Sequence, residues 1–256
     1  MRLGFADYSF KFRWGMKKTN QHEYSAIKGC DGVIVMSNED KDFIENEMGI
    51  KGKEISVIPG GIENYPDSCK NFISRKRDIA VIGWWGYIKG YPYIIEALKN
   101  LIKTFPGLKI TFFGFNPEIP EFKSNVAGDL LNHLEVKFGL TNRELLEALG
   151  DHKILLVPSL FEGFGKVVPE GMAMGNIIIA TEVGAAKDLI KDGINGVLIR
   201  KRNSNDIVEK VTYVLNNPDK FQELSLNARE FIKDYTWKNI SLKTVQFYER
   251  IIKLNK

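Results

Sequence analysis

The chain is poor in cysteine and histidine and contains no long apolar run. Its two cysteines, Cys30 and Cys69, lie far apart, and we recognise no secretory signal, which argues against a disulfide framework and a structural zinc site. The three histidines show no metal-ligand spacing: His22, His133 and His152. No apolar run approaches the roughly 20 residues needed to span a bilayer. These absences predict a cytoplasmic protein whose contact with the inner membrane surface, if it has one, is peripheral.

The charge of the chain is nearly balanced. Its 36 Lys and Arg residues against 32 Asp and Glu residues give a net charge of +4, which is too small to indicate nucleic-acid binding. A phosphate-bearing ligand or an anionic membrane surface fits this charge equally well. With 256 residues, 44% of them hydrophobic and 27% charged, the chain is typical of a globular protein of one large or two small domains.

Strand-like and helix-like segments alternate from Asp78 onward. They span residues 78–83, 93–104, 108–114, 142–149, 153–157, 167–174 and 176–180. Such alternation predicts parallel strands joined by crossover helices, which is an α/β fold with a Rossmann-like doubly wound parallel sheet. Three amphipathic segments follow, and we interpret them as surface and return helices: residues 204–215, 218–234 and 237–254.

A glycine-rich loop joins the predicted strand 153–157 to the predicted helix 167–174. In open α/β sheets, ligands bind at the carboxyl ends of the strands. Free backbone N–H groups at the start of the helix favour a diphosphate, and Gly163 and Gly165 allow close approach of the backbone. Two carboxylates, Glu162 before the helix and Glu170 inside it, are hydrogen-bond acceptors suited to hydroxyl groups. The loop therefore predicts a sugar-nucleotide site.

The string from Pro158 to Gly175 resembles the signature of the family-four (group 1) glycosyltransferases, which have the GT-B fold. It contains Pro-Ser, Glu-Gly-Phe-Gly and a second Glu eight residues after the first. The resemblance covers roughly residues 55–255. Its other matching segments are residues 79–83, 89–90, 93–104, 108–114, 177–181, 184–190 and 192–196.

The resemblance implies a donor-binding, GT-B carboxy-terminal domain that uses a nucleotide-diphosphate sugar and retains anomeric configuration. It implies no cofactor and no metal. Lys89 and the backbone from Gly163 to Val167 would hold the diphosphate, Glu162 the sugar hydroxyls and Glu170 the ribose. The implied catalytic residues are Glu162 and Lys89. The implied donor-binding residues are Gly83, Lys89, Glu162, Gly163, Phe164, Gly165, Lys166, Val167 and Glu170.

Two departures from the family pattern concern the expected contacts with the diphosphate. Trp84 stands directly after Gly83, where relatives usually have an Arg that helps to neutralise the leaving diphosphate. Loss of that Arg removes a bidentate phosphate partner that a Lys cannot fully replace. Lys166 occupies a position that is usually aliphatic, and we hypothesise that it partly compensates for the missing Arg. A solvent-facing lysine is the alternative interpretation of Lys166.

The amino-terminal part is short for a GT-B protein. Residues 32–36 and 54–58 predict two strands flanking a helix at 38–48, which resembles the end of the family's acceptor-binding domain. The resemblance divides the chain into a truncated remnant and linker (1–62), a donor-binding domain (63–235) and a carboxy-terminal return helix (236–256). An aromatic-rich opening at residues 5–14 either covers a sheet edge or binds a partner.

These features leave several functions open. The acceptor is a glycan, a lipid or a protein, and nucleic acid is not expected as a partner. The chain is one half of a split transferase that needs a partner chain, a natural remnant with a changed role, or a product started at an internal methionine. The alternative to a hexosyltransferase is a non-catalytic, sugar-nucleotide-binding subunit. A third interpretation is a Rossmann-like scaffold that binds no nucleotide.

Overall fold

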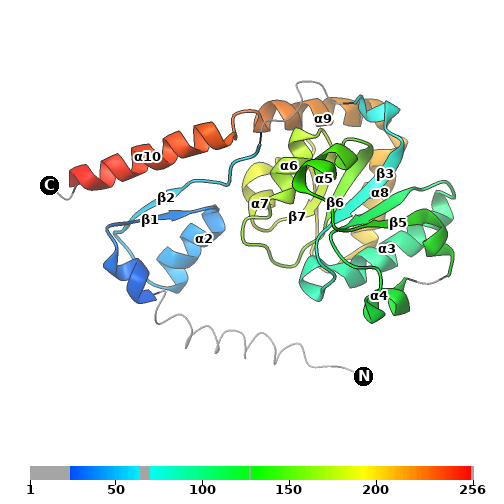
Figure 1. The fold of residues 1–256 in the computed structure, drawn as a ribbon, viewed down its shortest axis with the longest axis horizontal. Helices are drawn as coiled ribbons and strands as arrows, with labels where there is room; N and C mark the ends of the chain where they lie inside the picture. Colours follow the sequence, from blue (N-terminus) through cyan, green and yellow to red (C-terminus); the bar gives the residue numbers. More distant parts are fainter. Residues whose placement is uncertain (1–23, 64–69, 127, 255–256) are drawn as a thin grey trace. The chain divides into compact units, whose positions relative to one another are not determined.

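The computed structural model describes residues 24–63, 70–126 and 128–254 of the chain (Figure 1). The chain divides into two units. The larger unit runs from Pro59 to Ile240, and the smaller one combines the residues up to Ile58 with those from Ser241 onward. The aromatic-rich opening at residues 5–14 and the cysteine Cys69 lie outside the described residues.

The larger unit is built on a six-stranded parallel sheet. The strand order is β5-β4-β3-β6-β7-β8. The strands are β3 (Arg77–Ile82), β4 (Ile110–Phe113), β5 (Leu134–Lys137), β6 (His152–Val157), β7 (Ile177–Thr181) and β8 (Val197–Ile199). Every pairing in the sheet is parallel. The prediction of a doubly wound parallel α/β sheet is therefore confirmed.

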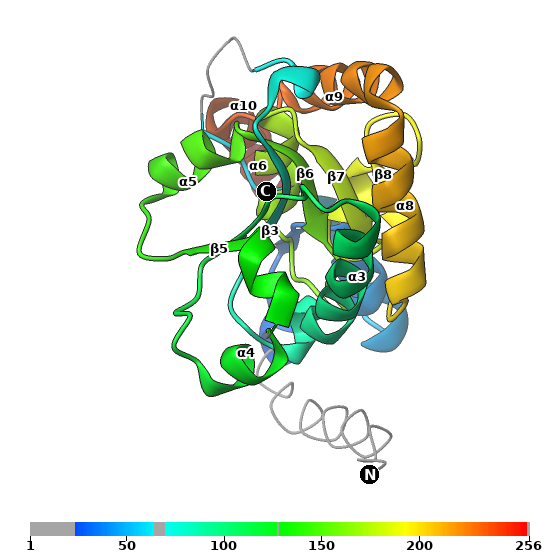
Figure 2. The ribbon, with the colours of Figure 1, turned by 90° about the vertical axis from the view of Figure 1, so that its right-hand side faces the viewer.

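Helices cover both faces of this sheet (Figure 2). They are α3 (Tyr91–Thr104), α4 (Pro120–Asn125), α5 (Asn142–Leu149), α6 (Val167–Ala173), α7 (Ala185–Leu189), α8 (Ser204–Asn216) and α9 (Pro218–Ile232). Alternate residues of a strand point to opposite faces, so Ile154 joins the core under α3 and α8, whereas Leu155 joins the core under α5 and α6. All residues of β4 and β7 are buried, as expected for a parallel sheet covered on both sides.

Helix α3 starts two residues before the predicted position. The sequence predicted a helix from residue 93, but α3 begins at Tyr91 because Pro92 is accommodated in its first turn. A proline is tolerated there, since the first N–H groups of a helix have no partner within the helix. The other predicted strands and helices of the larger unit agree with the structure to within two residues.

A buried polar network ties together the amino-terminal ends of the central strands. His152 Nδ1 lies 2.9 Å from the Ala148 carbonyl, so it donates, and Nε2 accepts from Thr111 Oγ1 at 2.8 Å. The buried Arg75 guanidinium donates to the carbonyl oxygens of His152 at 2.7 Å and Met174 at 2.8 Å. Burial lowers the pKa of His152 to about 4. The imidazole is therefore neutral at physiological pH.

The smaller unit contains a parallel pair of strands, β1 (Gly32–Val35) and β2 (Glu54–Val57). The connection between them starts as α2 (Asn38–Asp42) and continues as a π-helical turn, η1 (Phe43–Glu47). The sequence predicted one regular helix over residues 38–48. The structure instead has a wider second half, in which the Met48 N–H donates to the Phe43 carbonyl at 3.0 Å.

The last helix, α10 (Trp237–Leu254), contributes to both units. Its first turn, up to Ile240, belongs to the larger unit, and its remainder belongs to the smaller one. There Phe247 and Ile251 pack so closely on Gly32 that a Cβ at Gly32 would lie 2.7 Å from Ile251 Cδ1. Arg250 adds an ion pair of 3.3 Å with Glu54 of β2.

Candidate functional site

The candidate site lies where the strand order of the larger sheet reverses. From β3 the chain proceeds outward to β4 and β5, and it then returns to place β6 on the other side of β3. Ligands of open α/β sheets bind at the carboxyl ends of strands at such a switch point. Two loops meet there: residues 83–90 follow β3, and residues 158–166 follow β6.

The two loops are joined by their backbones. The Leu160 N–H donates to the Ile88 carbonyl at 2.7 Å. Gly90 has φ +76°, and a Cβ on this residue would lie 2.2 Å from the Pro158 carbonyl oxygen. A glycine is therefore required at position 90 by both the conformation and the space. The sequence motif includes Gly90, but this close approach depends on the strand order and was not predicted.

Lys89 and Glu162 meet across these loops. Lys89 Nζ lies 2.6 Å from Glu162 Oε1, and the two side chains are 20% and 11% exposed. The same carboxylate oxygen accepts from Ser159 Oγ at 2.7 Å. The Lys89 stem covers Gly83, where a Cβ would lie 3.4 Å from Lys89 Cε. The structure thus brings together the two predicted catalytic residues, and it adds Ser159, a residue of the motif to which the sequence assigned no role.

The Phe164 side chain anchors the glycine-rich loop to the core. This side chain is buried in the core and packs on Gly60, so only its backbone is placed to contact a ligand. Its carbonyl accepts from the Ala185 N–H at 2.5 Å. Gly184 has φ +51°, and a Cβ there would lie 2.9 Å from the carbonyl oxygens of both Gly163 and Phe164. Gly184 therefore fixes the loop, a role that the sequence did not reveal.

The backbone of this loop presents donors. Within the described part of the chain, the N–H groups from Gly163 to Val167 donate to no other group. Gly165 has φ +79°, which turns the chain into the first turn of α6 without the strain that a side chain would add. Successive N–H groups without partners favour an anion.

Glu170 lies on α6, one turn beyond Lys166. The Glu170 side chain is 6% exposed and the Lys166 side chain 53% exposed, and Lys166 Nζ lies 3.4 Å from Glu170 Oε1. Burial raises the pKa of Glu170 above its ordinary value; Lys166 opposes this effect and the nearby Glu63 adds to it. A buried carboxylate with one cation on its exposed side is suited to accept hydrogen bonds from ligand hydroxyl groups.

Trp84 lies near the start of the loop that follows β3. It is 54% exposed, and its six-membered ring covers Gly86, where a Cβ would lie 1.8 Å from Trp84 Cζ3. The neighbouring Trp85 packs instead into an aromatic cluster, with ring centroids 4.2 Å from Tyr91 and 5.2 Å from Phe122. Within residues 83–90, Lys89 supplies the cationic side chain.

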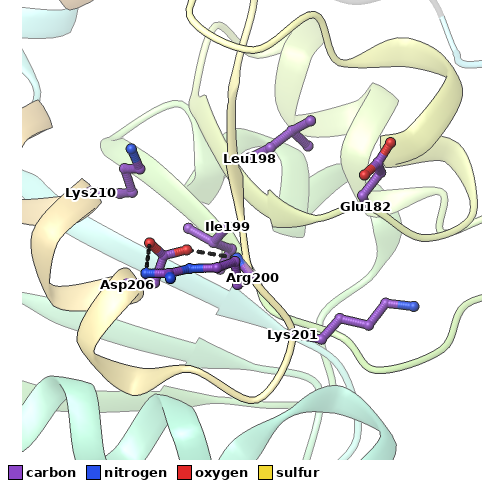
Figure 3. Close-up of a pocket in the computed structure, with 7 residues that line it drawn as sticks. All are labelled: Glu182, Leu198, Ile199, Arg200, Lys201, Asp206 and Lys210. Carbon is purple, nitrogen blue, oxygen red and sulfur yellow. Dashed lines mark hydrogen bonds and ion pairs between the residues drawn. The ribbon is translucent and has the colours of Figure 1, made fainter.

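A separate pocket of about 520 Å³ lies beside β8 and α8 (Figure 3). Its lining includes Glu182, Arg200, Lys201, Asp206 and Lys210. Arg200 and Asp206 bond to each other: the Arg200 N–H donates to Asp206 Oδ2 at 2.7 Å, and the guanidinium lies 3.0 Å from Oδ1. Burial opposes ionisation of Asp206, but the hydrogen bonds from Arg200 outweigh it and lower the pKa of Asp206. This pair fixes the β8–α8 turn.

Two features are absent from the residues that the structure describes. None of their helices combines the length and the apolar composition required to cross a lipid bilayer. No three of their His, Cys, Asp and Glu side chains gather as they would around a metal ion.

Comparison with known proteins gives consistent matches. The family model for glycosyl transferases group 1 matches residues 68–231. An uncharacterized glycosyltransferase of Methanocaldococcus jannaschii is 31% identical over 231 residues, which are 88% of this chain and 61% of that protein. A glycosyltransferase structure from Rickettsia africae has a TM-score of 0.76 at 21% identity and covers 92% of this chain and 67% of its own. HepE of Anabaena in complex with UDP and glucose has a TM-score of 0.75 at 17% identity and covers 88% and 65%.

The matched relatives are longer than this chain. The chain spans 61% of one M. jannaschii glycosyltransferase and 63% of a second. The matches therefore establish the family and the fold of the shared part.

Proposed function

The chain belongs to the glycosyl transferases group 1, and on this premise we propose that it binds a nucleotide-diphosphate sugar at the two loops after β3 and β6. The observation that carries the proposal is the ion pair of 2.6 Å between Lys89 and Glu162. It brings a cation and a carboxylate together at the switch point of the sheet, which supports a donor site there. On the adjoining loop, the N–H groups from Gly163 to Val167 donate to no group among the residues that the structure describes.

The donor would extend along α6 from its ribose to its sugar. Glu170 accepts from the ribose hydroxyls, and the backbone from Gly163 to Val167 holds the diphosphate with Lys89. Glu162 accepts from hydroxyls of the transferred sugar. Lys166 precedes α6 at the phosphate end of this path, and its ammonium pairs with Glu170 at 3.4 Å, so a role as a second phosphate-binding cation requires Lys166 to leave this pair. The HepE structure of the same fold contains UDP and glucose, so UDP conjugates are the first probes.

The proposed reaction is transfer of the sugar with retention of configuration. The bond between the anomeric carbon and the phosphate oxygen breaks, and a bond to an acceptor hydroxyl oxygen forms. The departing phosphate oxygen takes the proton of that hydroxyl. Lys89 and the backbone N–H groups stabilise the negative charge that develops on the leaving diphosphate, which is electrostatic stabilisation by fixed donors. No metal is required for this step.

The acceptor-binding half is proposed to come from polypeptide outside the described units. In its described residues, the smaller unit consists of a helical segment at 24–29, the strand pair β1 and β2 with α2 and η1 between them, and part of α10. The relatives extend well beyond the matched length. A partner chain, or a further part of the same protein, would complete the site for a glycan, lipid or protein acceptor.

The test is release of nucleoside diphosphate from UDP-glucose, GDP-mannose and ADP-glucose by the purified full chain. A transferase is expected to hydrolyse one of them slowly with water as the acceptor, and a Lys89→Met variant is expected to be slower by at least tenfold. The matched control is Lys187→Met, which removes a cation from α7. Equal rates in the two variants would contradict the role of Lys89.

A second function is favoured by Trp84. It stands where relatives usually have the phosphate-binding Arg, and its ring turns back onto Gly86. A subunit that binds the sugar nucleotide without catalysing transfer would show nucleotide affinity and no release in the same assay. The release measurement therefore separates the two functions.

A further inference from the structure

Two exposed aromatic side chains lie on the loops that carry the Lys89–Glu162 ion pair. Trp84 directly follows Gly83, the glycine that the Lys89 stem covers, and Phe161 directly precedes Glu162. Trp84 is 54% exposed and Phe161 is 61% exposed. The two loops that carry these rings are hydrogen-bonded to each other. Both rings therefore belong to the loops that carry the proposed sugar-binding carboxylate and its cation.

The position of the Trp84 ring is built into the loop. Gly86 has φ −173°, an extended conformation that any residue adopts, so its backbone does not require glycine. The Trp84 ring does: a Cβ on Gly86 would lie 1.8 Å from Cζ3 and 2.4 Å from Cη2. The absence of a side chain at Gly86 thus allows the Trp84 ring to pack on the loop backbone while more than half of this residue stays exposed.

The two rings are more exposed than the ion pair. The Lys89 and Glu162 side chains are 20% and 11% exposed, whereas Trp84 and Phe161 are more than half exposed. The donor needs the cation and the carboxylate, so it binds at the less exposed ion pair. A molecule that contacts the exposed rings of Trp84 and Phe161 reaches them from solvent, as an acceptor does.

The polar side chains on the same loops indicate which kind of acceptor would bind. Exposed aromatic rings beside convergent polar groups mark a ligand-binding surface. A pyranose ring offers an apolar C–H face to an aromatic ring and hydroxyl groups to the polar groups at its edge. On the basis of the proposed function, we propose that Trp84 and Phe161 form a stacking surface for a saccharide ring of the acceptor. A lipid acceptor would gain nothing from the ion pair that the same two loops carry.

The experiment is saturation-transfer NMR on the full chain, with and without UDP. The probes are the methyl α-glycosides of glucose, mannose, galactose and N-acetylglucosamine. The wild-type chain is expected to transfer saturation to the ring protons of at least one probe. Trp84→Ala is expected to reduce the transfer about fivefold, the size of one aromatic contact, and Trp84→Phe is expected to retain most of it.

Two further variants sharpen the test. Gly86→Ala keeps the indole ring but displaces it from its seat, so it is expected to lose transfer like Trp84→Ala. Tyr213→Ala, which removes an exposed aromatic ring from α8, is expected to have no effect. Circular dichroism of each variant verifies that the fold is retained.

The outcomes separate this inference from the proposed function. Absence of transfer to every probe, or equal transfer in the wild type and Trp84→Ala, would overturn the saccharide surface. A Trp84→Ala variant that loses affinity for UDP-glucose relative to UDP would also overturn it, because the ring would then contact the donor sugar. If no nucleotide binds the wild type but saturation transfer to a glycoside still depends on Trp84, the proposed donor site is contradicted and the saccharide surface is supported.

Discussion

Replacement of Glu162 by Gln should change the affinities for a nucleoside diphosphate and for its sugar conjugate in different ways. The amide keeps the shape of the side chain but removes the negative charge that lies 2.6 Å from Lys89 Nζ. The Lys89 cation then becomes available to a diphosphate, and one negative charge beside the proposed phosphate site disappears. The bare diphosphate should therefore bind more tightly, and the sugar conjugate should lose its advantage.

The magnitude follows from the ion pair. A charge-assisted hydrogen bond is worth about 1.5 to 3 kcal/mol, and the partial exposure of both side chains places this pair at the lower end. Release of about 1.5 kcal/mol corresponds to roughly tenfold tighter binding of UDP. UDP-glucose should gain less than UDP, because an amide oxygen is a weaker acceptor for sugar hydroxyls than a carboxylate.

Isothermal titration with UDP and UDP-glucose at physiological ionic strength measures both effects. Lys89→Met is the opposite perturbation and should weaken UDP binding at least tenfold. Glu209→Gln is the matched control, because it removes a carboxylate that is 69% exposed on α8. A Glu162→Gln variant that binds UDP less tightly than the wild type would refute this account of the ion pair.

Three further predictions concern the frame of the site. Because the pKa of His152 is about 4 in the folded chain and its ordinary value is 6.5, protons bind preferentially to the unfolded chain between these values. Stability should fall by about 2 kcal/mol from pH 7 to pH 5 in urea titrations, and His152→Gln should remove that loss. Arg75→Met should cost about 2 kcal/mol in the same assay, since it removes the donor of the buried Met174 carbonyl and one of the two donors of the His152 carbonyl; a cost below 1 kcal/mol would contradict this. Gly90→Ala should lower stability by at least about 2 kcal/mol, because φ is +76° and Pro158 O lies in the way, and it should also weaken UDP binding in calorimetry.

Much of the fold was predictable because its signals are local. The buried run at residues 153–157 and the short helix at 167–174 lie in the structure as β6 and α6 to within one residue. Alternation of strands and helices also predicts the parallel sheet. The π-helical turn at 43–47 was missed, since its wider winding has no distinct periodicity in a segment of this length.

The site required information that a local pattern does not contain. The motif identifies Glu162 and Lys89 as candidates, but their contact depends on β6 lying beside β3, which alternation alone does not specify. Phe164 belongs to the same motif, yet its side chain is an anchor in the core because Gly60 leaves room for it. The seat of Trp84 on Gly86 is likewise a packing relation that appears only in three dimensions.

The most direct test of the central claim is isothermal titration of the chain with UDP, GDP and ADP, each with and without an attached hexose, repeated with Glu170→Ala. The proposed donor site predicts that the wild type binds one nucleoside diphosphate and its conjugate, and that Glu170→Ala binds both at least tenfold more weakly. Absence of binding by the wild type, or undiminished binding by Glu170→Ala, would contradict the assignment of this loop and helix as the donor site.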